Sequence, residues 1–159
     1  LQFDRVPILW HSDDMGFKTG PMLSPDDLNH FVLSGHRALT RLEKGADKLS
    51  FLHACGNRAE FLDVLIDDVQ IDAIHSFEDT IELVTDAKQQ YGDRMTLLGG
   101  IDVDFLCRSD EAAIRKRVRE TLDVCMPGGG YCLGTGNSVT NYIPVDNYLT
   151  MIDEGRRWG

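Results

Sequence analysis

The sequence predicts an α/β fold in which about five strand–helix units form a parallel sheet. Short apolar runs alternate with longer segments whose apolar residues recur at the helical period. A helix after each strand returns the chain to the same end of the sheet, which makes neighbouring strands parallel. The chain has 159 residues and 42% hydrophobic residues, enough for one ordinary domain with a core. We therefore expect a single domain over residues 1–159.

The first predicted unit joins a short strand to a long helix. The apolar run Val6–His11 is followed by a polar loop over Ser12–Gly20. A helix is predicted to start at Ser24, because serine caps free N–H groups and the following Pro-Asp-Asp suits the first turn. We expect this helix to break near Ser34-Gly35 and to resume to about Lys44.

The remaining units follow the same alternation. The predicted strands are Leu49–Cys55, Ile71–Phe77, Met95–Ile101 and Gly128–Leu133. The predicted helices are Glu60–Val69 (with Phe61, Leu62 and Leu65 on one face), Thr80–Tyr91, Asp110–Val124 and Val145–Arg157. The Asp110–Val124 pattern is the clearest, with an apolar stripe of Ile114, Val118, Leu122 and Cys125 and with Arg115, Lys116, Arg119 and Glu120 expected to face water. Because a complete (β/α)₈ TIM barrel needs about 250 residues, we interpret the chain as the five C-terminal βα units of such a barrel.

The composition excludes several classes of partner. The formal net charge is −10, which disfavours nucleic acid and anionic membrane surfaces as partners. We find no apolar run of membrane-spanning length, no signal peptide and no glycine-rich nucleotide-binding motif. We expect a cytoplasmic protein, in which the four cysteines are metal ligands or buried side chains rather than disulfides.

Polar residues gather at the predicted carboxyl ends of the strands, where α/β proteins carry their chemistry. They are His11, Asp13 and Asp14; His53 and Cys55; His75 and Glu78; Asp102 and Asp104; and Cys132, Thr135 and Asn137. Two adjacent acids directly after a strand favour a site, so Asp13 and Asp14 are candidate catalytic acids. Glu78, directly after the predicted strand Ile71–Phe77, is the third candidate.

The pair His53 and Cys55 suggests a metal centre. One residue separates them, so on a strand both side chains point to the same face. With Cys132 as a third ligand from another strand, the set leaves one position open, as in a catalytic zinc site. The alternative is that these cysteines simply pack in the core. For the other residues we expect packing for Cys107, Cys125 and His75, and solvation for His30 and His36.

The charge of such a centre indicates a class of reaction. Zinc with two thiolates and a neutral imidazole is formally neutral, and a substrate thiolate in the fourth position makes it anionic. An electron-rich centre of this kind suits alkyl transfer to sulfur better than hydrolysis.

Four segments resemble the uroporphyrinogen decarboxylase superfamily: Asp13–Gly16, Leu52–Asn57, Leu98–Asp102 and Gly130–Asn137. The resemblance covers nearly the whole chain, corresponds to the C-terminal part of that family's barrel, and looks most like its cobalamin-dependent methyltransferase branch. It implies zinc held by His53, Cys55 and Cys132, a methylcobalamin-type corrinoid carried by a partner protein, and a small thiol such as coenzyme M as acceptor. It also implies that Asn57, Asp102, Thr135 and Asn137 line the substrate pocket.

The decarboxylases of this superfamily carry Asn-Leu-Gly-His-Gly near the C-terminus, where this chain has Cys132-Leu-Gly-Thr135-Gly. Thr135 thus replaces the histidine that touches the porphyrinogen there, which disfavours decarboxylation. A decarboxylase-like tetrapyrrole enzyme remains an alternative, as does an inactive fragment that only assembles with a partner. Since the chain starts without methionine, at Leu1, and three barrel strands are missing from our prediction, we expect homo-oligomers or completion by another barrel segment.

Overall fold

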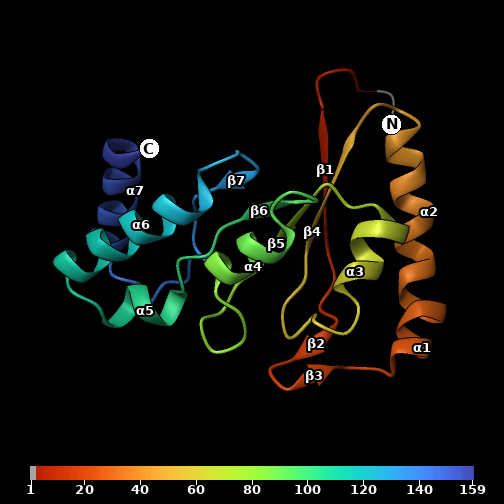
Figure 1. Cartoon of the computed structure of the whole chain (residues 1–159), viewed down its shortest axis with the longest axis horizontal. Coiled ribbons are helices and arrows are strands. Elements are labelled where there is room, and N and C mark those ends of the chain that lie inside the picture. Colours follow the sequence, from red (N-terminus) through yellow and green to blue (C-terminus); the bar gives the residue numbers. More distant parts are fainter. Residues whose placement is uncertain (1–2) are drawn as a thin grey trace. The chain divides into compact units, whose positions relative to one another are not determined.

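The computed structural model describes residues 3–159 and has the predicted α/β architecture (Figure 1). One five-stranded sheet has the strand order β1-β4-β5-β6-β7, which is also the order along the chain. The strands are β1 (Ile8–Ser12), β4 (Leu49–His53), β5 (Ala73–His75), β6 (Thr96–Leu98) and β7 (Tyr131–Cys132). Helices connect successive strands, so the predicted fold class is confirmed. The chain divides into two compact units, Leu1–Ile74 and His75–Gly159.

In the first unit, β1 and β4 pair in parallel from Ile8↔Leu49 to Ser12↔His53. The two strands run side by side in Figure 1, with the long helix α2 (Leu33–Lys44) alongside them. Ser50 and Leu52 are buried, while Phe51 packs edge-on against Trp10 at a ring-centroid distance of 5.9 Å. This alternation separates a face packed by helices from a face that carries aromatic rings.

The predicted polar loop after β1 contains a small hairpin instead. Its strands are β2 (Gly16–Phe17) and β3 (Gly20–Pro21), paired antiparallel. Two-residue strands give almost no periodic pattern, which is why the sequence did not indicate them. The hairpin matters for the site because it lies against the segment after β4.

The first helical segment starts where the sequence predicts but does not break where expected. The Ser24 side chain caps it, accepting a hydrogen bond from the Asp27 amide at 3.1 Å, and Pro25 opens α1 (Pro25–Asp27). A π-helical stretch, η1 (Leu28–Val32), precedes α2, and Gly35 lies inside α2. One glycine costs only about 1 kcal/mol in a helix, and the burial of neighbouring side chains offsets that cost.

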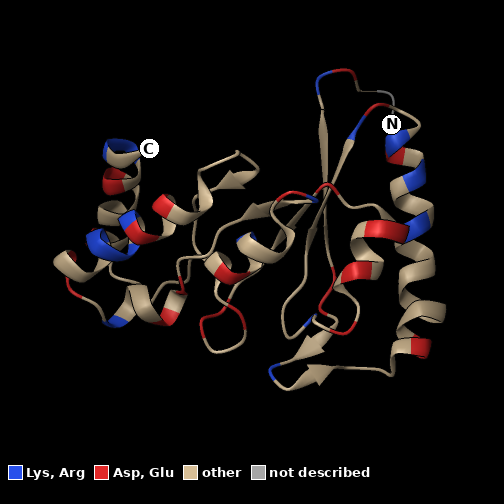
Figure 2. Ribbon diagram, in the orientation of Figure 1, with Lys and Arg blue, Asp and Glu red and all other residues tan. Residues whose placement is uncertain are grey.

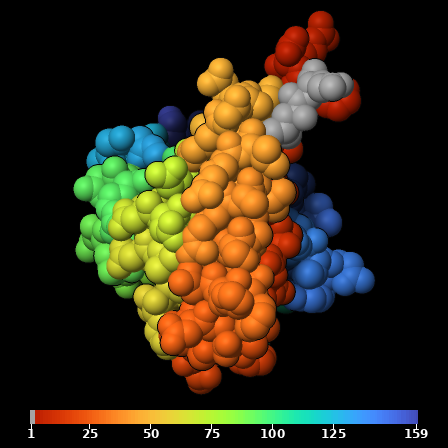
Figure 3. Space-filling view, turned by 90° about the vertical axis from the view of Figure 1, so that its right-hand side faces the viewer, coloured from red at the N-terminus to blue at the C-terminus, as the bar shows by residue number. Residues whose placement is uncertain are grey.

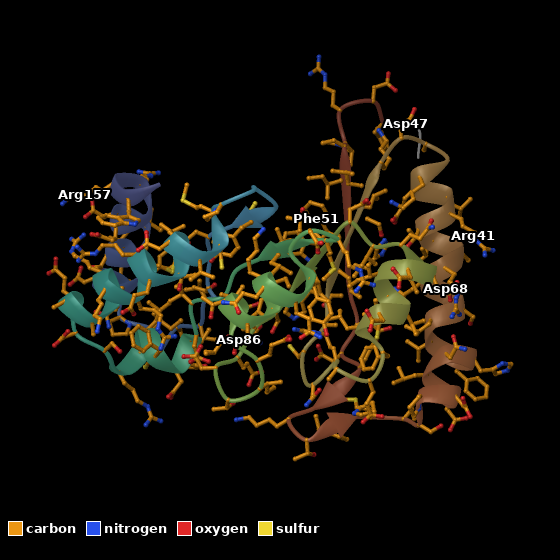
Figure 4. All side chains as sticks on the ribbon, in the orientation of Figure 1. Arg41, Asp47, Phe51, Asp68, Asp86 and Arg157 are labelled. Atoms are coloured by element: carbon orange, nitrogen blue, oxygen red, sulfur yellow. The ribbon has the colours of Figure 1, made fainter. Side chains whose placement is uncertain are left out.

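Helix α2 forms a continuous ridge on the face seen in Figure 3. Behind it lie α3 (Leu62–Val64) and η2 (Leu65–Val69). Asp68 of η2, labelled in Figure 4, pairs with Arg37 of α2 at 2.5 Å. The three apolar residues predicted to share one helical face, Phe61, Leu62 and Leu65, are all buried. Apolar burial and the Arg37–Asp68 ion pair thus anchor the helical layer of this unit.

In the second unit, β6 and β7 pair in parallel, with Leu98 opposite Cys132. The helices are α4 (Val84–Tyr91), α5 (Val103–Arg108), α6 (Glu111–Cys125) and α7 (Val145–Trp158). The predicted stripe on α6 is confirmed, since all four of its residues are buried. The short α5 was not predicted as a helix. No helix among residues 3–159 has the length and apolar character needed to cross a membrane.

One prediction for α6 is wrong. Arg115 does not simply face water: its guanidinium reaches Asp153 and Glu154 of α7, each at 2.7 Å. The hydrogen bonds that Arg115 donates to Glu154 first, and then to Asp153 and Glu111, hold its pKa above the usual range. Figure 2 shows residues of both charges side by side on these helices. The sequence of α6 alone shows a polar face, and it does not show that acidic residues of α7 lie opposite Arg115.

Candidate metal centre

The candidate centre lies where β1 and β4 end together in the first unit. Because the strands are parallel and Ser12 pairs with His53, the acids that follow β1 lie next to the histidine that ends β4. The Asp13 amide donates a hydrogen bond to the His53 carbonyl at 3.0 Å, which fixes this neighbourhood. The register of one strand pair thus brings two motifs about forty residues apart into one place.

Three predicted residues, Asp14, His53 and Cys55, meet there. One potential ligand atom from each residue lies within 4.8 Å of the other two. The Cys55 Sγ atom is 3.3 Å from the Nε2 atom of His53, and the Cys55 amide donates to Asp14 Oδ1 at 3.1 Å. Cys55 lies two residues beyond the end of β4, so the prediction that it belongs to the strand is wrong. Its sulfur reaches the histidine nevertheless.

Close backbone contact shapes the segment that carries Cys55. Gly56 has φ +87°, and a Cβ atom there would lie 2.0 Å from the Gly16 carbonyl oxygen. A Cβ atom on Gly16 would lie 2.7 Å from the Asn57 carbonyl oxygen. The Asn57 amide also donates to the Phe17 carbonyl at 2.8 Å. Only glycine fits at both positions, and the hairpin thereby fixes the course of the chain past Cys55.

The surroundings of His53 favour its neutral form. Burial is the main cause that lowers its pKa below the ordinary 6.5, the carboxylate of Asp14 opposes the change, and the charge of Arg58 adds to it. Arg58 is buried, and its Nη1 donates to the Ala54 carbonyl between the two candidate ligands. A neutral imidazole is the form that binds a metal.

The two adjacent acids have different contacts. Asp14 faces Cys55, whereas Asp13 Oδ2 accepts a hydrogen bond from Nε2 of His36 at 3.0 Å. His36 is therefore not solvated as predicted: it is buried, because the face of α2 that carries it packs toward β1. A cavity of about 390 Å³ adjoins this contact and is lined partly by His11, Asp13 and His36.

The other predicted site residues belong to the second unit. Asp102 caps α5 by accepting from the Phe105 amide at 2.9 Å, and its second oxygen accepts from the Asp79 amide at 2.9 Å. It thereby holds the turn that contains Glu78, whose carbonyl accepts from the amides of residues 81 and 82. Asp102 is buried and Glu78 is half-buried.

Thr135 and Asn137 lie in the loop after β7. The Thr135 hydroxyl donates to the Asn137 carbonyl at 2.6 Å, and the Thr135 carbonyl accepts from His75 Nε2 at 3.0 Å. The Asn137 side chain accepts from the Ser138 amide at 2.8 Å. Asn57, the remaining predicted substrate residue, lies in the first unit and accepts from the Ala59 amide at 3.0 Å. Their proposed contact with substrate stays a prediction.

Cys132, the predicted third zinc ligand, is exposed at the end of β7 in the second unit. The predicted ligand set therefore draws on both units, and its closure stays a prediction. The cysteines predicted to be structural fit that role: Cys125 is buried, which raises its pKa to about 11, and the Cys107 thiol donates to the Tyr142 carbonyl at 3.4 Å.

The three gathered residues fit a zinc-type ion. A thiolate and an imidazole are soft to borderline ligands suited to zinc, and a carboxylate completes such sets in catalytic centres. The observed distances leave the three ligand atoms close enough to converge on one ion with small side-chain movement. Sequence reasoning found all three residues. It missed His36 and Arg58, which carry no spacing pattern.

Comparisons with known proteins agree on one family. The model of the uroporphyrinogen decarboxylase (URO-D) family matches residues 10–158. A uroporphyrinogen decarboxylase from Cupriavidus necator is 34% identical over 93 residues, which are 57% of this chain and 25% of that protein. Another from Cupriavidus pinatubonensis is 32% identical over 75 residues, which are 45% of this chain and 20% of that protein.

A solved structure shares the fold. A methyltransferase from Methanosarcina mazei superposes with a TM-score of 0.74 at 20% identity, covering 94% of this chain and 42% of that one. The superposition supports the predicted α/β fold as part of a larger barrel-like architecture. The matched segments span a quarter or less of the curated relatives and less than half of the structural neighbour.

Proposed function

The chain belongs to the uroporphyrinogen decarboxylase family, and we propose that it takes part in zinc-dependent transfer of a methyl group from a methylcorrinoid protein to a thiol. One observation carries the proposal: Asp14, His53 and Cys55 bring their ligand atoms within 4.8 Å of one another. A thiolate and an imidazole in one set favour zinc and sulfur chemistry over the carboxylate-only chemistry of a metal-free site. The structural neighbour is named a methyltransferase, which adds support.

In this proposal His53 and Cys55 hold the zinc, with Cys132 as the third protein ligand. Bound zinc would keep the acceptor thiol deprotonated at neutral pH while leaving its sulfur nucleophilic. Burial and Arg58 keep the His53 ring neutral and ready to bind. Arg58 also holds the Ala54 carbonyl, which limits movement of the backbone between the two ligands.

Asp14 is the acid best placed to fill the fourth zinc position at rest and then to serve the acceptor that displaces it. Its Oδ1 accepts from the Cys55 amide, which leaves Oδ2 as the oxygen available to take the proton of an arriving thiol. With the proton on Asp14, the acceptor sulfur would supply the electron pair of the new bond to the methyl carbon, and the corrinoid of the partner protein would keep the electron pair of the carbon–cobalt bond that is lost. Of the other predicted acids, Asp13 binds His36 of α2, and Glu78 lies in the turn that Asp102 holds in the second unit.

The remaining parts of the proposal concern substrate and partners. Asn57, Asp102, Thr135 and Asn137 would line the pocket for a small thiol, and a corrinoid protein would deliver the methyl group. We propose a cytoplasmic location, and homo-oligomers or a complementing barrel segment as the assembled form. The net charge of −10 suits protein and small-molecule partners better than nucleic acid.

Metal content with thiol counting tests the proposal. We expect about one zinc per chain after reconstitution under reducing conditions. Two thiols should react only after chelation, and both should become reactive together. Replacing His53, Cys55 and Cys132 should abolish zinc uptake and methyl transfer, whereas Cys107→Ser is the matched control. Full transfer by the triple variant would overturn the proposal.

A second candidate function is favoured by the curated relatives, both of which are named uroporphyrinogen decarboxylases. In that case the carboxylates would act on a tetrapyrrole without a metal. Thr135 at the position of the decarboxylase histidine argues against it. Turnover of a porphyrinogen by chelator-treated protein would establish this second function and remove the first.

A further inference from the structure

We propose that Asp13 and His36 form a brace that positions Asp14 on the candidate metal centre, with His36 as a positioning residue. The brace consists of the hydrogen bond from His36 Nε2 to Asp13 Oδ2 at 3.0 Å. The inference rests on the proposed function, because it assigns His36 a role in the proposed zinc site. In this inference Asp13 holds the loop through His36, and Asp14 acts at the metal centre.

The short loop after β1 is fixed at both acids. The Asp13 amide donates to the His53 carbonyl at 3.0 Å, and the Asp13 side chain binds His36 on α2. The next residue, Asp14, then accepts from the Cys55 amide at 3.1 Å. With Asp13 tied to α2, the side chain of Asp14 is the one that remains directed at the candidate ligands.

His36 is itself held in place by buried polar groups. Only 8% of His36 is exposed, and its ring lies edge-on to the His11 ring at a centroid distance of 6.3 Å. His11 binds the carboxylate of Glu43, which is 3% exposed. A buried carboxylate with a histidine is a weak source of stability, since apolar residues of similar size often stabilise as well. The contact between His11 and Glu43 therefore serves to orient the His36 ring rather than to stabilise the fold.

The brace matters because burial does not hold either of the two adjacent carboxylates in place. Asp13 has a half-exposed side chain and Asp14 is exposed, so packing alone does not fix either one. Groups that orient a ligating side chain have measurable effects on metal affinity even though they never touch the ion. Loss of the brace would free Asp13 and allow the loop to turn Asp14 away from Cys55.

Amide exchange of the metal-free chain tests the brace directly. The Cys55 amide is protected by its bond to Asp14, so we expect His36→Leu to speed its exchange about tenfold, as Asp14→Ala should. His36→Gln, which keeps a donor, should restore the wild-type rate. The Ala113 amide, which donates to Asp110 in the other unit, serves as the reference. Wild-type exchange at Cys55 in His36→Leu, with fast exchange in Asp14→Ala, would overturn the brace.

Cobalt titration of the same variants provides the second readout. We expect His36→Leu and Asp13→Ala to weaken Co²⁺ binding about 10- to 100-fold, with recovery in His36→Gln. His30→Gln, at an exposed histidine on η1, is the matched control. If His36→Leu and Asp13→Ala both bind Co²⁺ as tightly as the wild type, the brace is also overturned. If the wild-type chain takes up no Co²⁺, the proposed function fails, while the exchange of Cys55 still decides the brace. If His36→Leu does not fold, Asp13→Ala decides both measurements, because it changes only a loop side chain.

Discussion

At the residue scale, His53 combines two properties that a zinc ligand needs. It ends a strand, which fixes its backbone, and its surroundings disfavour the protonated ring. Burial and the charge of Arg58 outweigh the opposing effect of Asp14. The histidine is therefore kept in the binding form at the expense of stability in acid.

This balance predicts how the metal-free protein responds to acid. In the unfolded chain His53 takes up its proton near pH 6.5, whereas in the folded chain it does so only at lower pH. The unfolded state binds more protons in that window, so the free energy of unfolding falls as the pH drops below about 6.5. Urea unfolding at several pH values should show a smaller acid loss for His53→Gln than for the wild type. Equal pH dependence of the two proteins would contradict the lowered pKa, and His30→Gln controls for the loss of any histidine.

Cys55 and Asp14 allow a graded prediction about affinity. Cys55→Ser should weaken zinc binding by at least about 100-fold, since even groups that only orient ligands cost 10- to 100-fold. Asp14→Asn keeps the size and a hydrogen-bond acceptor but loses the charge, so we expect a loss nearer tenfold. Competition with a chromophoric chelator measures both. Cys107→Ser should bind zinc like the wild type; equal losses in Cys55→Ser and Cys107→Ser would mean that the thiol effect is not local.

The sequence was informative about these residues because their chemistry is visible in their type and spacing. His53, Cys55 and the two acids stand out at predicted strand ends. His36 was wrongly expected to be solvated, because its burial depends on which face of α2 packs toward β1, and one histidine in a helix does not reveal that. The different roles of Asp13 and Asp14 depend on the same packing.

At the element scale, the approach of the β2–β3 hairpin to the Cys55 segment depends on glycine. We expect Gly56→Ala to lower the free energy of unfolding by about 1–3 kcal/mol and to weaken zinc binding as well, because the segment must move away from Gly16. The matched control is Gly35→Ala, at an exposed position of α2 where a Cβ atom meets nothing within 4 Å. That variant should gain about 0.5–1 kcal/mol. Urea unfolding and zinc titration check both, and a Gly56→Ala protein with wild-type stability would refute the tight contact.

The elements themselves were predictable where a period repeats often enough. Helix α6, with its buried stripe, matched its prediction to within a residue or so, because four turns of pattern leave little ambiguity. The hairpin, the π-helical stretch η1 and the short α5 were missed, since two to six residues hold too little pattern. The strands were predicted in place but too long, because apolar residues continue past the last ladder pair.

At the scale of the whole molecule, the family and the fold class are the firmest results. The alternation of strands and helices predicts a parallel sheet before any side chain is placed, and the family match then covers residues 10–158. Whether the chain acts as one domain stays a prediction, as does its activity. A protein that takes up zinc but moves no methyl group would favour the third alternative, an inactive fragment that assembles with a partner.

The outer edge of β1 leads to a prediction about assembly. β1 ends the strand order of the sheet, and no strand among residues 3–159 pairs with its outer edge. Ile8 and Trp10 of β1 are exposed, as is Val6 just before the strand, with Trp10 at 56%. An open edge with apolar side chains favours pairing with another strand. We therefore expect the purified chain to self-associate as its concentration rises, in sedimentation velocity measurements.

A lysine on the edge strand should oppose this association, because it would have to lose its water when another strand pairs. We expect Ile8→Lys to shift the sedimentation profile toward the monomer. Leu149→Lys, at an exposed position on α7, should leave the profile unchanged. If Ile8→Lys associates like the wild type while Leu149→Lys does not, the interface lies in the second unit. If the wild type stays monomeric at all concentrations, the edge is protected by other means, and a complementing segment from another chain becomes the form to look for.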